Sequence, residues 1–89
     1  MRYIKRPIEI EAFKWRKEIA PKWFDEAVKT GFIQHYLNYP IYGYEILIKR
    51  NDNEVNMAHA GDYIVKDQNG EIYPVKENVF FKTYKKVNE

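Results

Sequence analysis

A pair of short strands is predicted by the stretch GDYIVKDQNGEIYPVKENVFFKTY, which runs from Gly61 to Tyr84. Asn69-Gly70 favours a tight two-residue turn, because that turn type requires a positive φ at both positions. The segments 63–67 and 71–75 on either side are therefore expected to pair as an antiparallel hairpin. This stretch indicates a sheet-containing fold more clearly than any other part of the chain.

The rest of the same stretch predicts a sheet edge and a change of element. Pro74 has no backbone N–H to donate, so its strand should lie at the edge of a sheet or end there. Residues 76–80 are expected as a single helical turn, and 81–87 as a last strand.

A second hairpin is predicted upstream. Apolar and polar residues alternate over 44–49, the turn-forming run Arg50-Asn51-Asp52-Asn53 follows, and 54–59 is expected to return as the partner strand. The aromatic segment before it, up to Tyr44, shows no regular period from Phe32 onward, and we assign it no element.

One helix is predicted at residues 21–30. Pro21 suits the first helical position, and Gly31 suits the end of the helix. An apolar stripe at helical spacing should face a sheet, and it consists of Trp23, Phe24, Ala27 and Val28.

The opening segment, residues 2–15, is expected to be a strand that changes face. Ile8 to Ala12 alternate with glutamates, but Phe13 and Trp15 fall on the glutamate side. Either a bulge near Ala12 and Phe13 returns these rings to the core, or the sheet is covered on both sides at this end.

Together these elements predict a single α+β domain over residues 1–89. We expect a mostly antiparallel, curled sheet of five or six strands with one packed helix, at about residues 21–30. A chain of 89 residues has room for one core, and 45% hydrophobic residues, including eight tyrosines, are enough to fill it.

Composition excludes several classes of function. The formal net charge of +2 is too small to indicate binding to nucleic acid or to a membrane surface. Because the chain has no cysteine, it can form no disulfide bond and carry out no thiol chemistry. No apolar run approaches the roughly 18 residues of a membrane span. We therefore expect a cytoplasmic protein without a membrane partner.

Both ends of the chain carry a further pattern. The opening RYIKRPIEIEAFKW has a basic tripeptide, a proline and a hydrophobic-Glu-Ala-aromatic-Trp run, and the ending AGDYIVKDQNGEIYPVKENVFFKTYKKV has Gly-Asp-aromatic, Tyr-Pro and Thr-Tyr elements. These segments resemble a widespread group of small uncharacterised phage and prophage proteins. The resemblance covers roughly half of the chain, and it implies a phage or prophage setting inside a bacterial host cell.

The resemblance supplies no reaction. At Val75 and Glu77 this chain departs from the group, which commonly has Cys and Pro there, so no thiol role carries over. We predict no cofactor.

Candidate catalytic residues are few. His35 and His59 lie far apart in the sequence without carboxylates at ligand spacing, so no metal site is predicted. His59 and Asp62 flank Gly61; they either form an acid–base pair, as in a small hydrolase, or hydrogen-bond the turn. Serine is absent and threonine occurs twice, which leaves nucleophilic catalysis almost without candidates.

Two kinds of binding residue stand out instead. Tyrosines gather in the middle of the chain, and such rings suit either a core or an interface; they are Tyr36, Tyr39, Tyr42 and Tyr44. Basic residues gather near the ends, at Arg2, Lys5 and Arg6, at Lys14, Arg16 and Lys17, and at Lys82, Lys85 and Lys86. The first and last groups would meet if the terminal strands are neighbours.

The sequence thus predicts a protein that acts by binding, and no catalysis is expected. Its partner would be a host protein, a second copy of itself in a homo-oligomer, or a small ligand. The alternative is nucleic-acid binding through the basic terminal strands, in which bases stack on rings and cations follow phosphates. The candidate binding residues are Tyr36, Tyr39, Tyr42, His59, Asp62, Lys82, Lys85 and Lys86.

Overall fold

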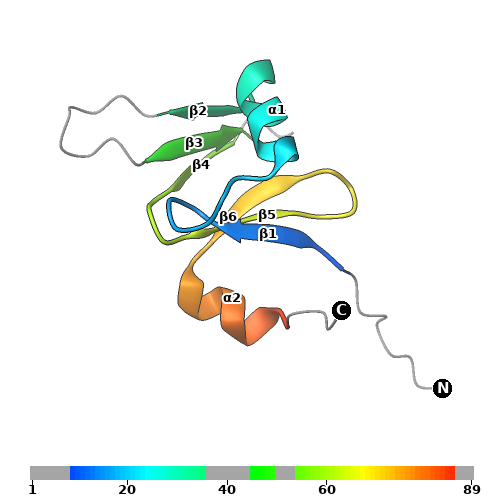
Figure 1. Ribbon diagram of the computed structural model, residues 1–89, viewed down its shortest axis with the longest axis vertical. Coiled ribbons are helices and arrows are strands. Elements are labelled where there is room, and N and C mark those ends of the chain that lie inside the picture. Colours follow the sequence, from blue (N-terminus) through cyan, green and yellow to red (C-terminus); the bar gives the residue numbers. More distant parts are fainter. Residues whose placement is uncertain (1–8, 36–44, 50–53, 86–89) are drawn as a thin grey trace.

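The computed structural model describes residues 9–35, 45–49 and 54–85. These ranges contain six strands and two helices (Figure 1): β1 (Glu11–Lys14), α1 (Lys22–Thr30), β2 (Ile33–His35), β3 (Ile46–Lys49), β4 (Val55–Ala58), β5 (Tyr63–Lys66), β6 (Ile72–Val75) and α2 (Glu77–Thr83). The strands form two antiparallel sheets, ordered β1-β5-β6 and β2-β3-β4. The predicted α+β class is confirmed, with the strands divided between two sheets and a second helix added.

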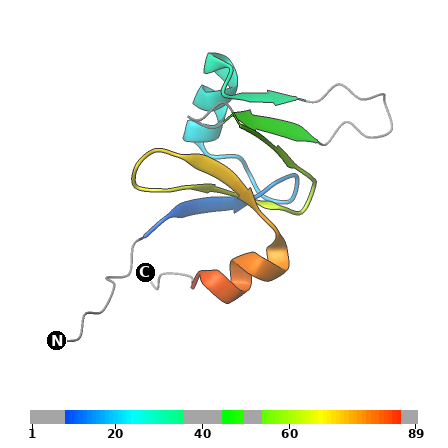
Figure 2. The ribbon, with the colours of Figure 1, turned by 180° about the vertical axis from the view of Figure 1, so that it is seen from behind.

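The sheet β1-β5-β6 lies in the middle of the molecule and is covered on both faces. Figure 1 shows α1 and the sheet β2-β3-β4 on one side of it and α2 on the other, and Figure 2 shows the same order from behind. Two consecutive residues of β5, Ile64 and Val65, are both fully buried. Because neighbouring side chains of a strand point to opposite faces, this burial requires a cover on each side.

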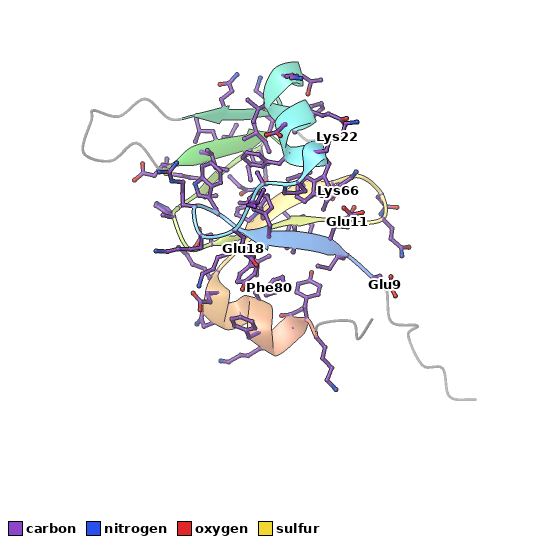
Figure 3. All side chains as sticks on the ribbon, in the orientation of Figure 1. Glu9, Glu11, Glu18, Lys22, Lys66 and Phe80 are labelled. Atoms are coloured by element: carbon purple, nitrogen blue, oxygen red, sulfur yellow. The ribbon has the colours of Figure 1, made fainter. Side chains whose placement is uncertain are left out.

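The same two-sided cover explains the change of face in the opening strand. Four consecutive residues of β1 pair with β5 without interruption, from Glu11 opposite Lys66 to Lys14 opposite Tyr63. The bulge expected near Ala12 and Phe13 is therefore wrong, and the alternative of a sheet covered on both sides is confirmed. Figure 3 shows Glu9 and Glu11 at the start of this strand, where both side chains are exposed.

The core on the α1 side is built around aromatic rings. The centroid of the Phe13 ring lies 5.1 Å from that of Phe24 and 5.7 Å from that of Trp23, both in edge-to-face arrangements. The ring centroids of Trp15 and Phe24 also lie 5.1 Å apart. Aliphatic side chains from both sheets complete this core: Ile33, Ile46, Ile48, Ala58 and Ile64.

Helix α1 follows the sequence prediction closely. Pro21 precedes its first residue, and Gly31 ends it at φ 85° while donating its N–H to the carbonyl of Val28. That left-handed conformation suits a glycine, which has no Cβ to clash. In the predicted apolar stripe, Phe24 and Ala27 are buried, and their neighbours Trp23 and Val28 are half-buried.

The hairpin β5–β6 is confirmed, but its turn differs from the predicted type. Gly70 has a positive φ and Asn69 does not. The Asp67 carboxylate accepts the backbone N–H groups of Asn69 and Glu71 at 2.9 and 3.0 Å. This side chain stabilises a longer turn, since Asp readily hydrogen-bonds the backbone that follows it. Pro74 lies in β6, an edge strand, as predicted.

The sheet β2-β3-β4 has one buried and one open face. The predicted hairpin of 44–49 with 54–59 is confirmed as β3 paired with β4, and β2 adds a strand in the segment we had left unassigned. Facing away from the core are four apolar side chains, which we call the outer face: Phe32, Leu47, Val55 and Met57. Leu47 lies opposite Met57, and the carbonyl of Phe32 accepts the N–H of Lys49, which lies opposite Val55.

Helix α2 differs from what the sequence predicted for residues 76–87. The expected single turn at 76–80 continues to Thr83, so the last strand predicted at 81–87 is wrong over its described residues. The cause is long-range packing: the Phe80 ring stacks on Tyr63 of β5 with centroids 3.9 Å apart and planes within 1°. Figure 3 shows Phe80 between α2 and the sheet.

Two further contacts hold α2 against the sheet, and they raise the pKa values of Lys14 and Tyr73. The Lys14 ammonium lies 3.1 Å from the Glu77 carboxylate, and hydrogen bonding to that carboxylate raises the pKa of Lys14. The hydroxyls of Tyr73 and Tyr84 lie 3.1 Å apart. Burial, and after it this hydrogen bond, raises the pKa of Tyr73.

Both shifts predict a loss of stability in alkali. A pKa raised by folding means that the protonated group favours the folded state, so its contribution is complete below the ordinary pKa values of 10.5 and 10.0 and is lost as the pH rises beyond them. The free energy of unfolding, measured by urea denaturation, should therefore fall as the pH is raised from about 10 to about 12. Tyr73→Phe, which removes one titrating hydroxyl, should lose less over this interval. An equal loss would contradict the assignment.

Candidate functional site

The turn from His59 to Asp62 joins β4 to β5 and is closed by its own acidic side chain. The Asp62 carboxylate accepts the backbone N–H of His59 at 2.9 Å, and the N–H of Asp62 donates to the carbonyl of His59 at 3.0 Å. Gly61 takes a φ of 94°, which glycine allows. The Asp62 side chain is 11% exposed, whereas that of His59 is 49% exposed. Asp62 therefore stabilises the turn.

Backbone hydrogen bonds attach this turn to the end of β1. The N–H of Trp15 donates to the carbonyl of Asp62 at 2.8 Å, and the carbonyl of Trp15 accepts the N–H of Gly61 at 3.0 Å. These bonds continue the pairing of β1 with β5 by one residue. The chain between β1 and α1 thus starts directly beside the turn at Gly61.

His59 and Asp62 lie near each other, but their side chains are too far apart for a direct hydrogen bond. His59 Nδ1 is 3.8 Å from Asp62 Oδ2, longer than the roughly 2.6–3.2 Å over which a carboxylate orients an imidazole. The second Asp62 oxygen lies 3.9 Å from the ammonium of Lys76. The hydrogen bond that Asp62 makes to the backbone accounts for its position without a catalytic role, and the small-hydrolase hypothesis stays a prediction.

The hydroxyls that a nucleophilic mechanism would need are engaged elsewhere. Thr30 Oγ1 donates to the carbonyl of Ala27 at 3.2 Å, and Thr83 Oγ1 donates to that of Val79 at 2.8 Å. Both bonds lie within or at the end of a helix. In the part of the chain that the structure describes, no group of three or more His, Asp or Glu side chains is placed to hold a metal ion.

A shallow, open hollow of about 510 Å³ lies beside the same turn. Its walls are the turn residues 60–62 on one side and, on the other, residues 76–78 with Phe81 of α2. The Asp62 and Glu77 carboxylates and the Lys76 ammonium border it, while Phe81 contributes an aromatic surface that is 61% exposed. His59 is not part of the described lining.

Of the other predicted binding residues, the structure describes Lys82 and Lys85. Lys82 lies in the last turn of α2, Lys85 follows the helix, and both are exposed. Lys14 is paired with Glu77, so the middle basic group is partly neutralised. Lys82 therefore lies on a helix and not on the terminal strand that the prediction assumed. Outside the described residues lie Tyr36, Tyr39, Tyr42 and Lys86, with Arg2, Lys5 and Arg6.

Exposed apolar side chains are what sequence reasoning missed. Ile19, between β1 and α1, is 95% exposed, and on the outer face Val55 and Phe32 are 52% and 50% exposed. For Ile19 a signal was present, since a single isoleucine stands in the polar run RKEIAPK. The exposure of the outer face carried no such signal, because alternation alone does not say which strand faces lack a cover.

Comparisons of the chain with protein-family models, with curated proteins and with solved structures returned no match. The resemblance to small phage and prophage proteins therefore stays a prediction that rests on the residues at the two ends of this sequence. Among the described residues, no helix is long and apolar enough to cross a membrane.

The role of Asp62 in the turn can be tested by two substitutions. Asp62→Ala leaves the His59 N–H without its acceptor and should lower the free energy of unfolding by about 1–3 kcal/mol. Asp62→Asn keeps an acceptor oxygen and should cost clearly less, as measured by urea denaturation. If both variants lose the same stability, the charge of Asp62 matters and the turn hydrogen bond does not.

Proposed function

We propose that this protein acts by binding a protein partner through the outer face of the sheet β2-β3-β4. The observation that carries the proposal is the grouping of Phe32, Leu47, Val55 and Met57 on one side of this sheet, with Phe32, Val55 and Met57 between 40% and 52% exposed. Large apolar side chains exposed next to one another are typical of interaction sites, whereas single ones need no explanation.

The pattern of neighbours supports a protein contact. Leu47 lies between Gln34 and Met57, and Lys49 lies between Phe32 and Val55, so each of the two rows on this sheet contains two apolar side chains and one polar one. An apolar centre with polar groups beside it is the usual composition of a protein interface. Sheet positions also hold these side chains in place before binding, which lowers the entropy cost of association.

The cellular setting is part of the proposal. The terminal patterns that resemble small phage and prophage proteins favour a bacterial cytoplasm, where the partner would be a host protein. Zero cysteines agree with a reducing compartment.

A purification from the bacterial host tests the outer face directly. Tagged wild-type protein should retain a defined host protein, identified by mass spectrometry of proteins and bound small molecules. The double variant Val55→Thr/Met57→Gln, which keeps side-chain size but adds polar groups, should lose that protein. Val79→Thr, a change at a similarly exposed apolar residue of α2 (48%), should keep it. A protein retained equally by all three would contradict the proposal.

Nucleic-acid binding is a second candidate, favoured by one observation. Phe81 is 61% exposed, and the exposed lysines Lys82 and Lys85 follow it closely. A ring with neighbouring cations can stack on a base while the cations contact phosphates.

This second candidate predicts retention on immobilised single-stranded DNA at low salt and release as salt is added. Changing Lys82, Lys85 and Lys86 to Gln should abolish retention. The same change at three other exposed lysines, Lys22, Lys29 and Lys49, alters the net charge equally and should have less effect. Failure of the wild-type protein to bind at low salt would exclude this function.

A further inference from the structure

Asn69 is the only asparagine of this chain that is followed by a glycine. Asn69 and Gly70 are both exposed, and Figure 1 shows the loop that carries them, between β5 and β6, at one end of the central sheet. Asparagine is a thermally labile residue, and a following glycine has no side chain to shield its backbone nitrogen. A Cβ built on Gly70 would meet no described residue within 4 Å apart from its chain neighbours. The bond between Asn69 and Gly70 is therefore sterically open.

The side-chain amide of Asn69 can react with the backbone of Gly70. The Gly70 nitrogen forms a bond to Cγ of Asn69, and the bond between Cγ and the side-chain nitrogen breaks. That nitrogen leaves as ammonia, together with the proton that the Gly70 nitrogen gives up, and the product is a cyclic imide. Water then opens the imide at one of its carbonyls, which leaves aspartate or isoaspartate. No oxidant or reductant takes part.

In the folded protein the turn opposes this ring closure. The N–H of Gly70 donates to the carbonyl of Asp67 at 3.1 Å, so the nitrogen that must attack is already engaged. The Asp67 carboxylate accepts the backbone N–H groups of Asn69 and Glu71 at 2.9 and 3.0 Å and so holds the backbone on both sides of the reactive bond. Ring closure requires this backbone to rotate, and the turn must therefore open first.

Opening of this turn does not require unfolding of the domain. The hydrogen bond from Asn69 to Asp67 is exposed, whereas Val65, two residues before Asp67, is fully buried. Exposed turns open at a lower free energy than buried strands do. The folded protein therefore reaches the reactive conformation by local opening, and the rate of the reaction depends on the fraction of molecules in which the turn is open.

We propose that Asn69 is a modification site that converts spontaneously to aspartate and isoaspartate, at a rate that Asp67 limits by holding the turn closed. The conversion runs in one direction, because the ammonia is lost to the solvent. The proposal goes beyond the binding function of the outer face and does not depend on it.

Conversion weakens the hairpin that contains the central strand. It adds a negative charge to a turn that already contains Asp67 and Glu71, and like charges repel. Isoaspartate also adds a carbon atom to the main chain, which changes the spacing of the N–H groups that Asp67 accepts. Because β5 lies between β1 and β6, a loosened hairpin lowers the stability of the whole sheet.

Peptide mapping by tandem mass spectrometry tests the reaction in the purified full chain, because replacing an amide NH2 by OH changes the mass of the peptide that contains residue 69. Folded wild-type protein at neutral pH should convert at Asn69 about tenfold to about a hundredfold more slowly than the same protein unfolded in guanidinium chloride. Asn56 in β4 and Asn78 in α2 are internal controls and should stay unconverted in the folded protein. The proposal is overturned by equal rates in both states, or by no conversion of the folded protein while the unfolded protein converts fully.

Three variants test the role of Asp67. Asp67→Ala removes the acceptor of two backbone N–H groups and should raise the rate in the folded protein at least about fivefold, whereas Asp67→Asn keeps an acceptor oxygen and should stay near the wild-type rate. Asp62→Ala is the matched control, since it removes a similar acceptor from the turn between β4 and β5 and should leave the rate at Asn69 near that of the wild type. An equal rise in both alanine variants, or a rise in Asp67→Asn as large as that in Asp67→Ala, overturns the control by the turn.

Discussion

Burial of β5 on both of its faces is the constraint on which the rest of this structure depends. Ile64 points to the core shared with α1 and the second sheet, whereas Val65 points to the side that α2 covers, and neither is accessible to solvent. A short three-stranded sheet with apolar groups on both faces is unstable in water unless two layers cover it. The chain supplies these layers from opposite ends, with α1 near its start and α2 near its end.

Both candidate binding regions follow from this arrangement. Covering one face with α2 places Phe81 and Glu77 opposite the turn at Gly61, and the space between them is the hollow. Pairing β1 with β5 holds Trp15 against the turn at Gly61. The second sheet uses one face for the shared core, and its outer face remains open because neither helix packs there. The candidate binding surfaces are therefore those on which no helix or strand of this small domain packs.

The chemistry near Asp62 shows why sequence proximity is a weak guide to catalysis. His59 and Asp62 are close in space, as their spacing suggested, but the carboxylate is engaged by the backbone N–H of His59 at 2.9 Å and the imidazole stays 3.8 Å away. The need to satisfy a backbone donor in a tight turn explains the acidic residue.

What the sequence by itself determined was local. The alternation in 44–49, the apolar stripe of α1 and the Gly70 turn each specify structure between near neighbours, so both hairpins and the first helix were predicted correctly. The tertiary structure alone decided the division into two sheets, the helical state of 81–83 and the exposure of the outer face. These depend on contacts between distant segments: Phe80 is held by stacking on Tyr63, and β1 pairs with a strand about fifty residues later. Propensity is weak compared with such packing, because a short segment gains most of its stability from the surface that it buries.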